Sequence, residues 1–245
     1  MQKAEVPYEV LSSGMTERHK DGAIESIGGG WGTVLAARLG ETRCRSLEDF
    51  LADAWAGQAP VYPSRSHVFA AFDATPLDSV RAVILGQDPY PTEGQACGLA
   101  FSVPEVLPPG VSRPRSLGRI LKELERERFT TLGRATLDRW TGRKGVLLLN
   151  ATLTYGLDRP DHSAVWREFT TAVIRTLIAR PEPIAFLLWG KRAQKWGELI
   201  TPPHMPICSP HPMARGRAEP FVGSCPFSRA NDFLGPLRKI DWDLD

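Results

Sequence analysis

Four short apolar runs in this 245-residue sequence each end at residues able to do chemistry. In chain order these residues are Asp88, Asn150, the pair Gly190-Lys191, and His211. If the runs are parallel strands of one sheet, their carboxyl ends meet at one edge, where an acid, an amide, a basic loop and an imidazole converge. The sequence contains neither GxGxxG nor GxxxxGK. We therefore expect acid/base or electrostatic work on an uncharged group rather than phosphate cradling.

The elements that position these residues can be predicted from apolar patterning. The continuous apolar runs at 81–85, 145–149, 183–189 and 206–209 predict buried strands. Helical patterns precede, separate or follow them at about 46–55, 66–74, 117–128, 166–179, 191–200 and 228–234. This alternation predicts a single α/β domain with a central four-stranded parallel sheet flanked by helices on both faces. Residues 1–40 have few apolar positions before Trp31. We expect them to form a poorly ordered or loosely packed arm, with the domain spanning 41–245.

Composition narrows the class of protein without naming a partner. Net charge is +2, and 42% of residues are hydrophobic, which is ordinary for a globular domain. Any nucleic-acid binding must therefore come from local basic clusters. The four cysteines lie far apart without a CxxC pair, which argues against a zinc site and fits a reducing compartment. With no signal peptide or long apolar run, we expect a cytoplasmic monomer that needs no membrane, metal or cofactor.

The loop after the first strand holds its acid in a stiff setting. In Gly86-Gln-Asp-Pro-Tyr-Pro91, each proline fixes its own φ and biases the preceding residue toward extended geometry. Asp88 and Tyr90 are therefore constrained at the carboxyl end of a buried strand. An ordinary strand-to-helix turn whose aspartate caps a helix is the alternative interpretation.

Several motifs, in order, extend this loop into a family resemblance. GQDPYPTEGQACGLAFSV (86–103) resembles the water-activating motif of family 1 uracil-DNA glycosylases, and LLLNATLT (147–154) resembles their uracil-reading strand. SPHP (209–212) and FVGSCPFS (221–228) resemble two later segments of the same family. The resemblance covers about residues 46–238.

The resemblance implies a role for each matching residue. Asp88 would orient or activate the attacking water and stabilise positive charge on the sugar. Phe101 would stack on the extruded base, Asn150 would read the O4 and N3–H edge of uracil, and Tyr90 would exclude the thymine methyl. His211 would donate to uracil O2, helped by the backbone of Gln87. Taken singly, Phe101 could instead be a core residue, Asn150 a cap and His211 structural.

The sequence departs from the family pattern around the DNA-contacting loops. Pro91 replaces a histidine, which predicts slower turnover, and Arg215 stands where a leucine normally wedges into the base stack. An arginine there could stack on bases or bind a phosphate. The residues expected to contact DNA are Arg115, Ser116, Gly190, Lys191, Met213, Arg215 and Arg217. Because several are basic where the family has neutral residues, we expect steep salt sensitivity. Because the phage uracil-glycosylase inhibitor protein holds the family's leucine in an apolar pocket, we expect it to bind poorly where Arg215 stands instead.

The sequence thus predicts a monofunctional enzyme that hydrolyses the N-glycosidic bond of uracil flipped out of single- or double-stranded DNA, leaving an abasic site for base excision repair. Two alternatives remain at this point. One is a related glycosylase of altered base specificity, because Pro91 and Arg215 both adjoin the site. The other is a non-catalytic binder of uracil or abasic DNA, against which the presence of Asp88 argues.

Overall fold

The computed structural model describes residues 24–134, 136–158, 161–214 and 220–245. Its principal sheet contains β2 (Ala82–Gly86), β3 (Val146–Asn150), β5 (Ala185–Trp189) and β6 (Met205–Ser209), all parallel and in the order β3-β2-β5-β6. A separate antiparallel pair joins β1 (Val61–Tyr62) to β4 (Tyr155–Gly156). The predicted α/β architecture with a four-stranded parallel sheet is therefore confirmed.

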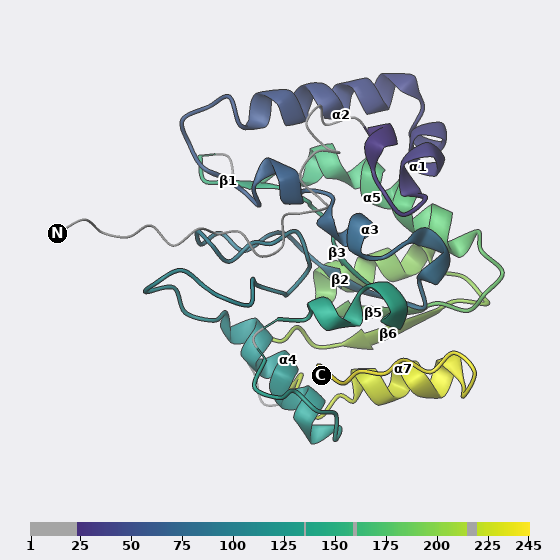
Figure 1. The fold of residues 1–245 in the computed structure, drawn as a ribbon. Helices are drawn as coiled ribbons and strands as arrows, with labels where there is room; N and C mark the ends of the chain where they lie inside the picture. Colours follow the sequence, from purple (N-terminus) through teal and green to yellow (C-terminus); the bar gives the residue numbers. More distant parts are fainter. Residues whose placement is uncertain (1–23, 135, 159–160, 215–219) are drawn as a thin grey trace.

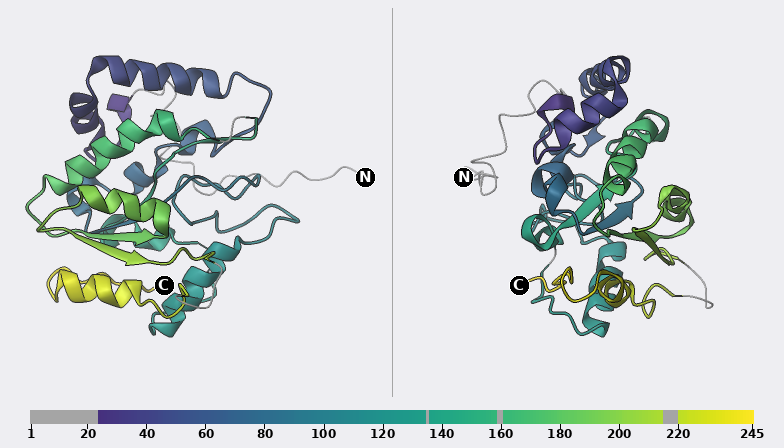
Figure 2. Two further views of the ribbon diagram at one scale, coloured as in Figure 1. Left: turned by 180° about the vertical axis from the view of Figure 1, so that it is seen from behind. Right: turned by 90° about the vertical axis from the view of Figure 1, so that its right-hand side faces the viewer.

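Helices cover both faces of this sheet (Figure 1). One layer holds α1 (Trp31–Leu39), α2 (Glu41–Ala54), α3 (Ala70–Ala74), α5 (Ser163–Ile178) and α6 (Lys191–Gln194). The other holds α4 (Arg115–Arg126) and α7 (Pro226–Leu234). The views in Figure 2 show the sheet between these two layers. None of the helices in the described ranges is long and apolar enough to cross a membrane.

The alternation of strand side chains divides the core into two clusters. Val83 and Leu85 of β2 pack with the α1, α2 and α5 layer, whereas Ala82 and Ile84 pack with the α4 and α7 layer. Every residue of β2, β3 and β5 is buried, as expected for parallel strands covered on both faces. This burial explains why the strands read as continuous apolar runs rather than as alternating ones.

The expected loose packing of residues 1–40 is wrong for residues 24–39. A short 3₁₀ helix (Ile24–Ser26) and α1 pack onto the domain, and the side chains of Ile24, Trp31 and Leu35 are fully buried. The indole Nε1 of Trp31 donates to the carbonyl of Thr75 at 2.9 Å. The cause is that these three large apolar side chains, though sparse in sequence, all pack into the core cluster that also contains the buried residues of α5. Residues 1–23 lie outside the described residues.

Candidate active site

The carboxyl edge of the sheet positions the acid-bearing loop. Sheet-like pairing continues past β2 and β3, with Ala151 N–H donating to Gly86 O at 3.0 Å and Thr152 N–H donating to Gln87 O at 2.9 Å. The loop then returns across β3, where Ala100 N–H donates to Leu148 O at 3.0 Å. Both ends of the loop are thereby tied to β3, and Asp88 and Phe101 are held beside its last residue.

A cavity of about 260 Å³ opens at this edge, as the parallel-sheet prediction required. The residues predicted from sequence that line it are Gln87, Asp88, Tyr90, Phe101, Ser116, Asn150, His211 and Met213. They come from the loops or ends of β2, β3 and β6 and from the first turn of α4. Residues more than 120 positions apart in the sequence therefore line the same cavity. The cavity size and mixed lining suit a small molecule with both polar and apolar surface.

Asp88 presents a carboxylate from a partly desolvated position. Burial raises the pKa of Asp88 above its usual value, while a hydrogen bond from Gln87 and the charge of Arg192 partly oppose that shift. The Gln87 bond runs from Nε2 to the Asp88 Oδ2 atom at 3.0 Å. A carboxylate that is held in place and poorly hydrated can accept a proton from water and can stabilise nearby positive charge.

Asn150, the last residue of β3, is buried to 8% exposure. Within the described ranges its side-chain amide makes no hydrogen bond, although it lines the cavity. An amide offers one acceptor and two donors, so an occupant of the cavity with complementary groups could pair with it. This is the property expected of a residue that reads a base edge.

Phe101 and Tyr90 form an aromatic wall that is held by hydrogen bonds. Phe101 adopts a positive φ of 61°, which is unfavourable for a bulky residue, and its ring centroid lies 5.2 Å from that of Trp189. The Tyr90 hydroxyl donates to the Phe101 carbonyl at 3.0 Å and pairs with the Ser116 hydroxyl at 2.9 Å. Burial raises the pKa of Tyr90 to about 12. The hydrogen bond from Tyr90 thus holds the Phe101 backbone in its unfavourable conformation.

His211 lines the same cavity, with its ring centroid 6.0 Å from that of Phe101. Its Nδ1 atom accepts a hydrogen bond from Met213 N–H at 3.0 Å. Burial lowers the pKa of His211, which favours the neutral ring. A neutral imidazole carries one proton, so accepting at Nδ1 leaves that proton on Nε2. Gly190, at φ 88°, permits this placement, because a Cβ atom there would lie 2.7 Å from that of His211.

The residues predicted to contact DNA differ in their exposure and in whether the structure describes them. Arg115 and Lys191 are exposed at the first positions of α4 and α6, next to the cavity-lining residues Ser116 and His211. Ser116, which also lines the cavity, is buried and its hydroxyl pairs with that of Tyr90. Arg215 and Arg217 lie outside the described residues.

Two arginines near the site were missed by the sequence reasoning. Arg192 acts on the pKa of Asp88, and Arg119 donates to the loop that follows His211. Arg192 could have been found from sequence, because it directly follows Lys191 at a predicted strand end. Nothing in the sequence pairs Arg119 with a loop more than 90 residues later. No group of three metal-ligating side chains occurs in the described ranges.

Comparisons with known proteins agree with this geometry. The model of the uracil DNA glycosylase superfamily matches residues 72–235. A uracil-DNA glycosylase of Coxiella burnetii (strain CbuG_Q212) is 41% identical over 221 residues, covering 88% of this chain and 94% of the relative. Uracil-DNA glycosylase 2 of Streptomyces coelicolor is 42% identical over 220 residues, covering 87% and 94%.

A solved structure gives the same answer for the fold. The crystal structure of mimivirus uracil-DNA glycosylase superposes with a TM-score of 0.75 at 26% identity, covering 87% of this chain and 86% of that one. A variant of the mimivirus protein has also been solved in complex with UGI, at a TM-score of 0.75, 25% identity, and coverage of 87% and 88%. With the family model spanning most of the chain and relatives above 40% identity over nearly their whole length, this chain belongs to the uracil DNA glycosylase superfamily.

Proposed function

We propose that Asp88, Phe101, Asn150 and His211 carry out the excision of uracil from DNA that this enzyme performs. The observation that supports these roles is their convergence on one cavity of about 260 Å³. Each presents a different chemistry: a carboxylate, an aromatic face, an unpaired amide and a neutral imidazole. This combination matches the demands of breaking a bond between a sugar and a flat pyrimidine.

Base recognition falls to the Asn150 amide and the aromatic wall. The amide donates to O4 of uracil and accepts from N3–H, whereas cytosine presents the opposite polarity at both positions. The wrong base would leave a buried polar group unpaired, which discriminates strongly. Phe101 stacks on the base, and the ring of Tyr90 occupies the space that a thymine methyl would need.

The reaction breaks the bond between C1′ of the deoxyribose and N1 of uracil. The bonding electron pair leaves with the base, and the anion forming at O2 is stabilised by the Nε2–H of His211 and by the backbone at Gln87. Asp88 stabilises the positive charge on the sugar and takes a proton from the water that adds to C1′. The proton taken up by Asp88 is returned, directly or through solvent, to the uracil anion, so the products are free uracil and an abasic site with a hydroxyl at C1′.

The DNA around the flipped nucleotide is held, in this proposal, by the exposed cations at the cavity rim. Arg115 and Lys191 supply phosphate contacts, with Arg215 as the candidate wedge. The motif pattern supports the further proposal that the enzyme is a family 1 member, as a variant with proline at position 91 and arginine at 215. All four cysteines are unpaired, which supports a reducing, cytoplasmic setting. We propose that it acts as a monomer.

A single-turnover excision assay on single- and double-stranded uracil DNA tests this assignment, with Asp88→Asn as the comparison. Removing the carboxylate should slow excision roughly 10²- to 10⁴-fold, the range for a placed acid/base group. Binding to uracil DNA should persist. Because burial disfavours the Asp88 charge, the variant should also melt at a higher temperature. Excision by Asp88→Asn at the parental rate would refute the role of Asp88.

The two alternatives predict different results in the same assay. A non-catalytic binder would release no uracil from either substrate. A glycosylase of altered specificity would prefer another base when uracil, mismatched thymine and hypoxanthine compete. Relatives above 40% identity are uracil-DNA glycosylases, so neither alternative is favoured.

A further inference from the structure

One side chain of helix α4, that of Arg119, hydrogen-bonds the segment that follows His211. The Nη1 atom of Arg119 donates to the carbonyl of Pro212 at 2.8 Å and to that of Ala214 at 3.3 Å. These two carbonyls lie on either side of Met213. The guanidinium therefore binds the turn after His211 at two points from a helix more than 90 residues earlier in the chain.

Met213, which lies between those carbonyls, donates the hydrogen bond that fixes the orientation of the His211 ring. Met213 N–H donates to His211 Nδ1 at 3.0 Å, and Ala214 N–H closes the turn on the His211 carbonyl at 2.7 Å. If the peptide groups at 212–214 rotate, Met213 N–H no longer points at the ring. Nδ1 could then be protonated instead of Nε2, and the ring would present an acceptor to the cavity.

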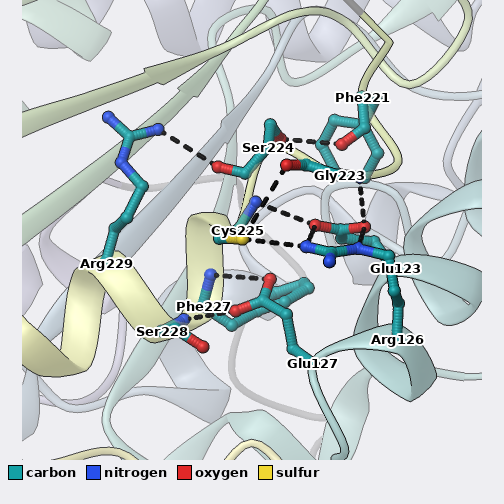
Figure 3. A network of polar contacts seen from close by, with 10 residues as sticks. All are labelled: Glu123, Arg126, Glu127, Phe221, Gly223, Ser224, Cys225, Phe227, Ser228 and Arg229. Atoms are coloured by element: carbon teal, nitrogen blue, oxygen red, sulfur yellow. Dashed lines mark hydrogen bonds and ion pairs between the residues drawn. The ribbon is translucent and has the colours of Figure 1, made fainter.

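The helix that carries Arg119 is itself fixed from the other end (Figure 3). The buried carboxylate of Glu123 accepts from the N–H groups of Gly223 at 2.6 Å and Cys225 at 2.8 Å, and it pairs with Arg126. Glu127 accepts from Ser228 N–H at 2.6 Å at the start of α7. One turn beyond Arg119, α4 is therefore locked to the body of the domain. The arginine thus has a fixed base from which to hold the turn.

We infer that Arg119 is a positioning residue that sets the tautomer and orientation of His211 by bridging the carbonyls of Pro212 and Ala214. It acts through the turn and does not touch the base. The inference rests on the proposed role of His211 in stabilising the leaving uracil. The competing explanation for an exposed arginine near the cavity is a contact with a DNA phosphate.

Nitrogen-15 NMR of the histidine rings tests the inference without relying on activity. In the unaltered protein at neutral pH, His211 should show an unprotonated Nδ1 and a protonated Nε2, assigned by comparison with His211→Gln. In Arg119→Ala the ring should become a mixture of tautomers. Arg119→Lys, which keeps the charge but loses the planar fork, should fall between them. Lys122→Ala removes a similar exposed charge from the same helix and should leave the spectrum unchanged.

Kinetics separate the two explanations for Arg119. Loss of positioning should lower the single-turnover rate at saturating DNA roughly ten- to hundredfold, with unchanged DNA affinity and salt dependence. Loss of a phosphate contact would weaken binding, reduce the salt slope by about one, and be largely restored by lysine. That second pattern, or His211 nitrogen shifts identical in Arg119→Ala and the parent, overturns the inference. Failure of the unaltered protein to excise uracil would instead refute the proposed function, because the tautomer measurement stands apart from it.

Discussion

Gly86 and Asn150 are register partners at the ends of β2 and β3, and a Cβ atom at position 86 would overlap the Oδ1 atom of Asn150. It would also lie 3.0 Å from the Cβ of Ala100. The space that lets the amide face the cavity therefore exists because residue 86 has no side chain. The glycine that opens the GQDPY motif makes room for the base-reading residue of the neighbouring strand.

Gly86→Ala should therefore displace the Asn150 amide and abolish most uracil excision. The backbone of β2 cannot yield easily, because its residues are all buried. Gly118→Ala is the matched control. It lies in α4 with open space around its Cβ position, and it should raise stability by about 0.5–1 kcal/mol. Excision rate and melting temperature would be measured for both. An active Gly86→Ala enzyme would show that Asn150 does not depend on this space.

The excision rate should decrease only at acid pH. Asp88 works as a carboxylate, and burial raises its pKa, so it is neutralised at higher pH than an ordinary aspartate. His211 works as a neutral donor, and burial lowers its pKa, so it stays neutral below the usual histidine value. Tyr90, with a pKa of about 12, stays neutral throughout. Single-turnover rates should thus be level from neutral to mildly alkaline pH and decline in acid. A rate that increases as the pH is lowered from neutrality to about 5 would contradict these assignments.

Two substitutions at Tyr90 should separate its ring from its hydroxyl. Tyr90→Phe keeps the ring that faces C5 but leaves the Phe101 carbonyl and Ser116 hydroxyl without their partner. It should remain specific for uracil and lose about 1–2 kcal/mol of unfolding free energy. Tyr90→Ala removes the ring and should admit thymine. Single-turnover release of both bases, with chemical denaturation, checks the pair. Equal exclusion of thymine by Tyr90→Ala would rule out the ring as the barrier.

Arg215 is the proposed replacement for the family's wedge. Arg215→Ala should slow excision from duplex DNA more than from single strands, because only the duplex needs its stack held open. Arg215→Leu should bind the phage inhibitor protein more tightly than the parent does, since that inhibitor accommodates an apolar side chain. Calorimetric titration would measure the second effect. Tight binding of the inhibitor by the unaltered enzyme would contradict the predicted weak binding.

Lys191 should make binding more sensitive to salt than a serine at that position would. It is exposed at the first position of α6, and Gly190 separates it from the end of β5. Lys191→Ser should reduce the slope of log affinity against log salt by about one, because one phosphate contact and its released counterion are lost. Affinity for uracil DNA measured over a salt series checks this. Lys195→Ser, another exposed lysine a turn later, serves as the control.

The sheet and most of the cavity-lining residues could be predicted from sequence because they depend on short, local residue patterns. A continuously apolar strand must be buried on both faces, and a polar residue just after it must emerge at the carboxyl edge. Asp88, Asn150 and His211 therefore line one cavity as predicted, with the Phe101 ring beside them. Packing of Trp31 and Leu35 was not predicted, because sparse apolar residues show no periodic signal even when they fill a core.

The sequence by itself determined which chemical groups gather at the sheet edge, since residue type and the point where an apolar run ends are both properties of short segments. Only the tertiary structure decided how those groups are oriented. The Ser116 hydroxyl pairs with that of Tyr90, and Arg119 donates to the carbonyls that flank Met213. These contacts join residues distant in the chain through hydrogen bonds a few ångströms long. Such distances depend on how α4 docks against the sheet, which no local pattern encodes.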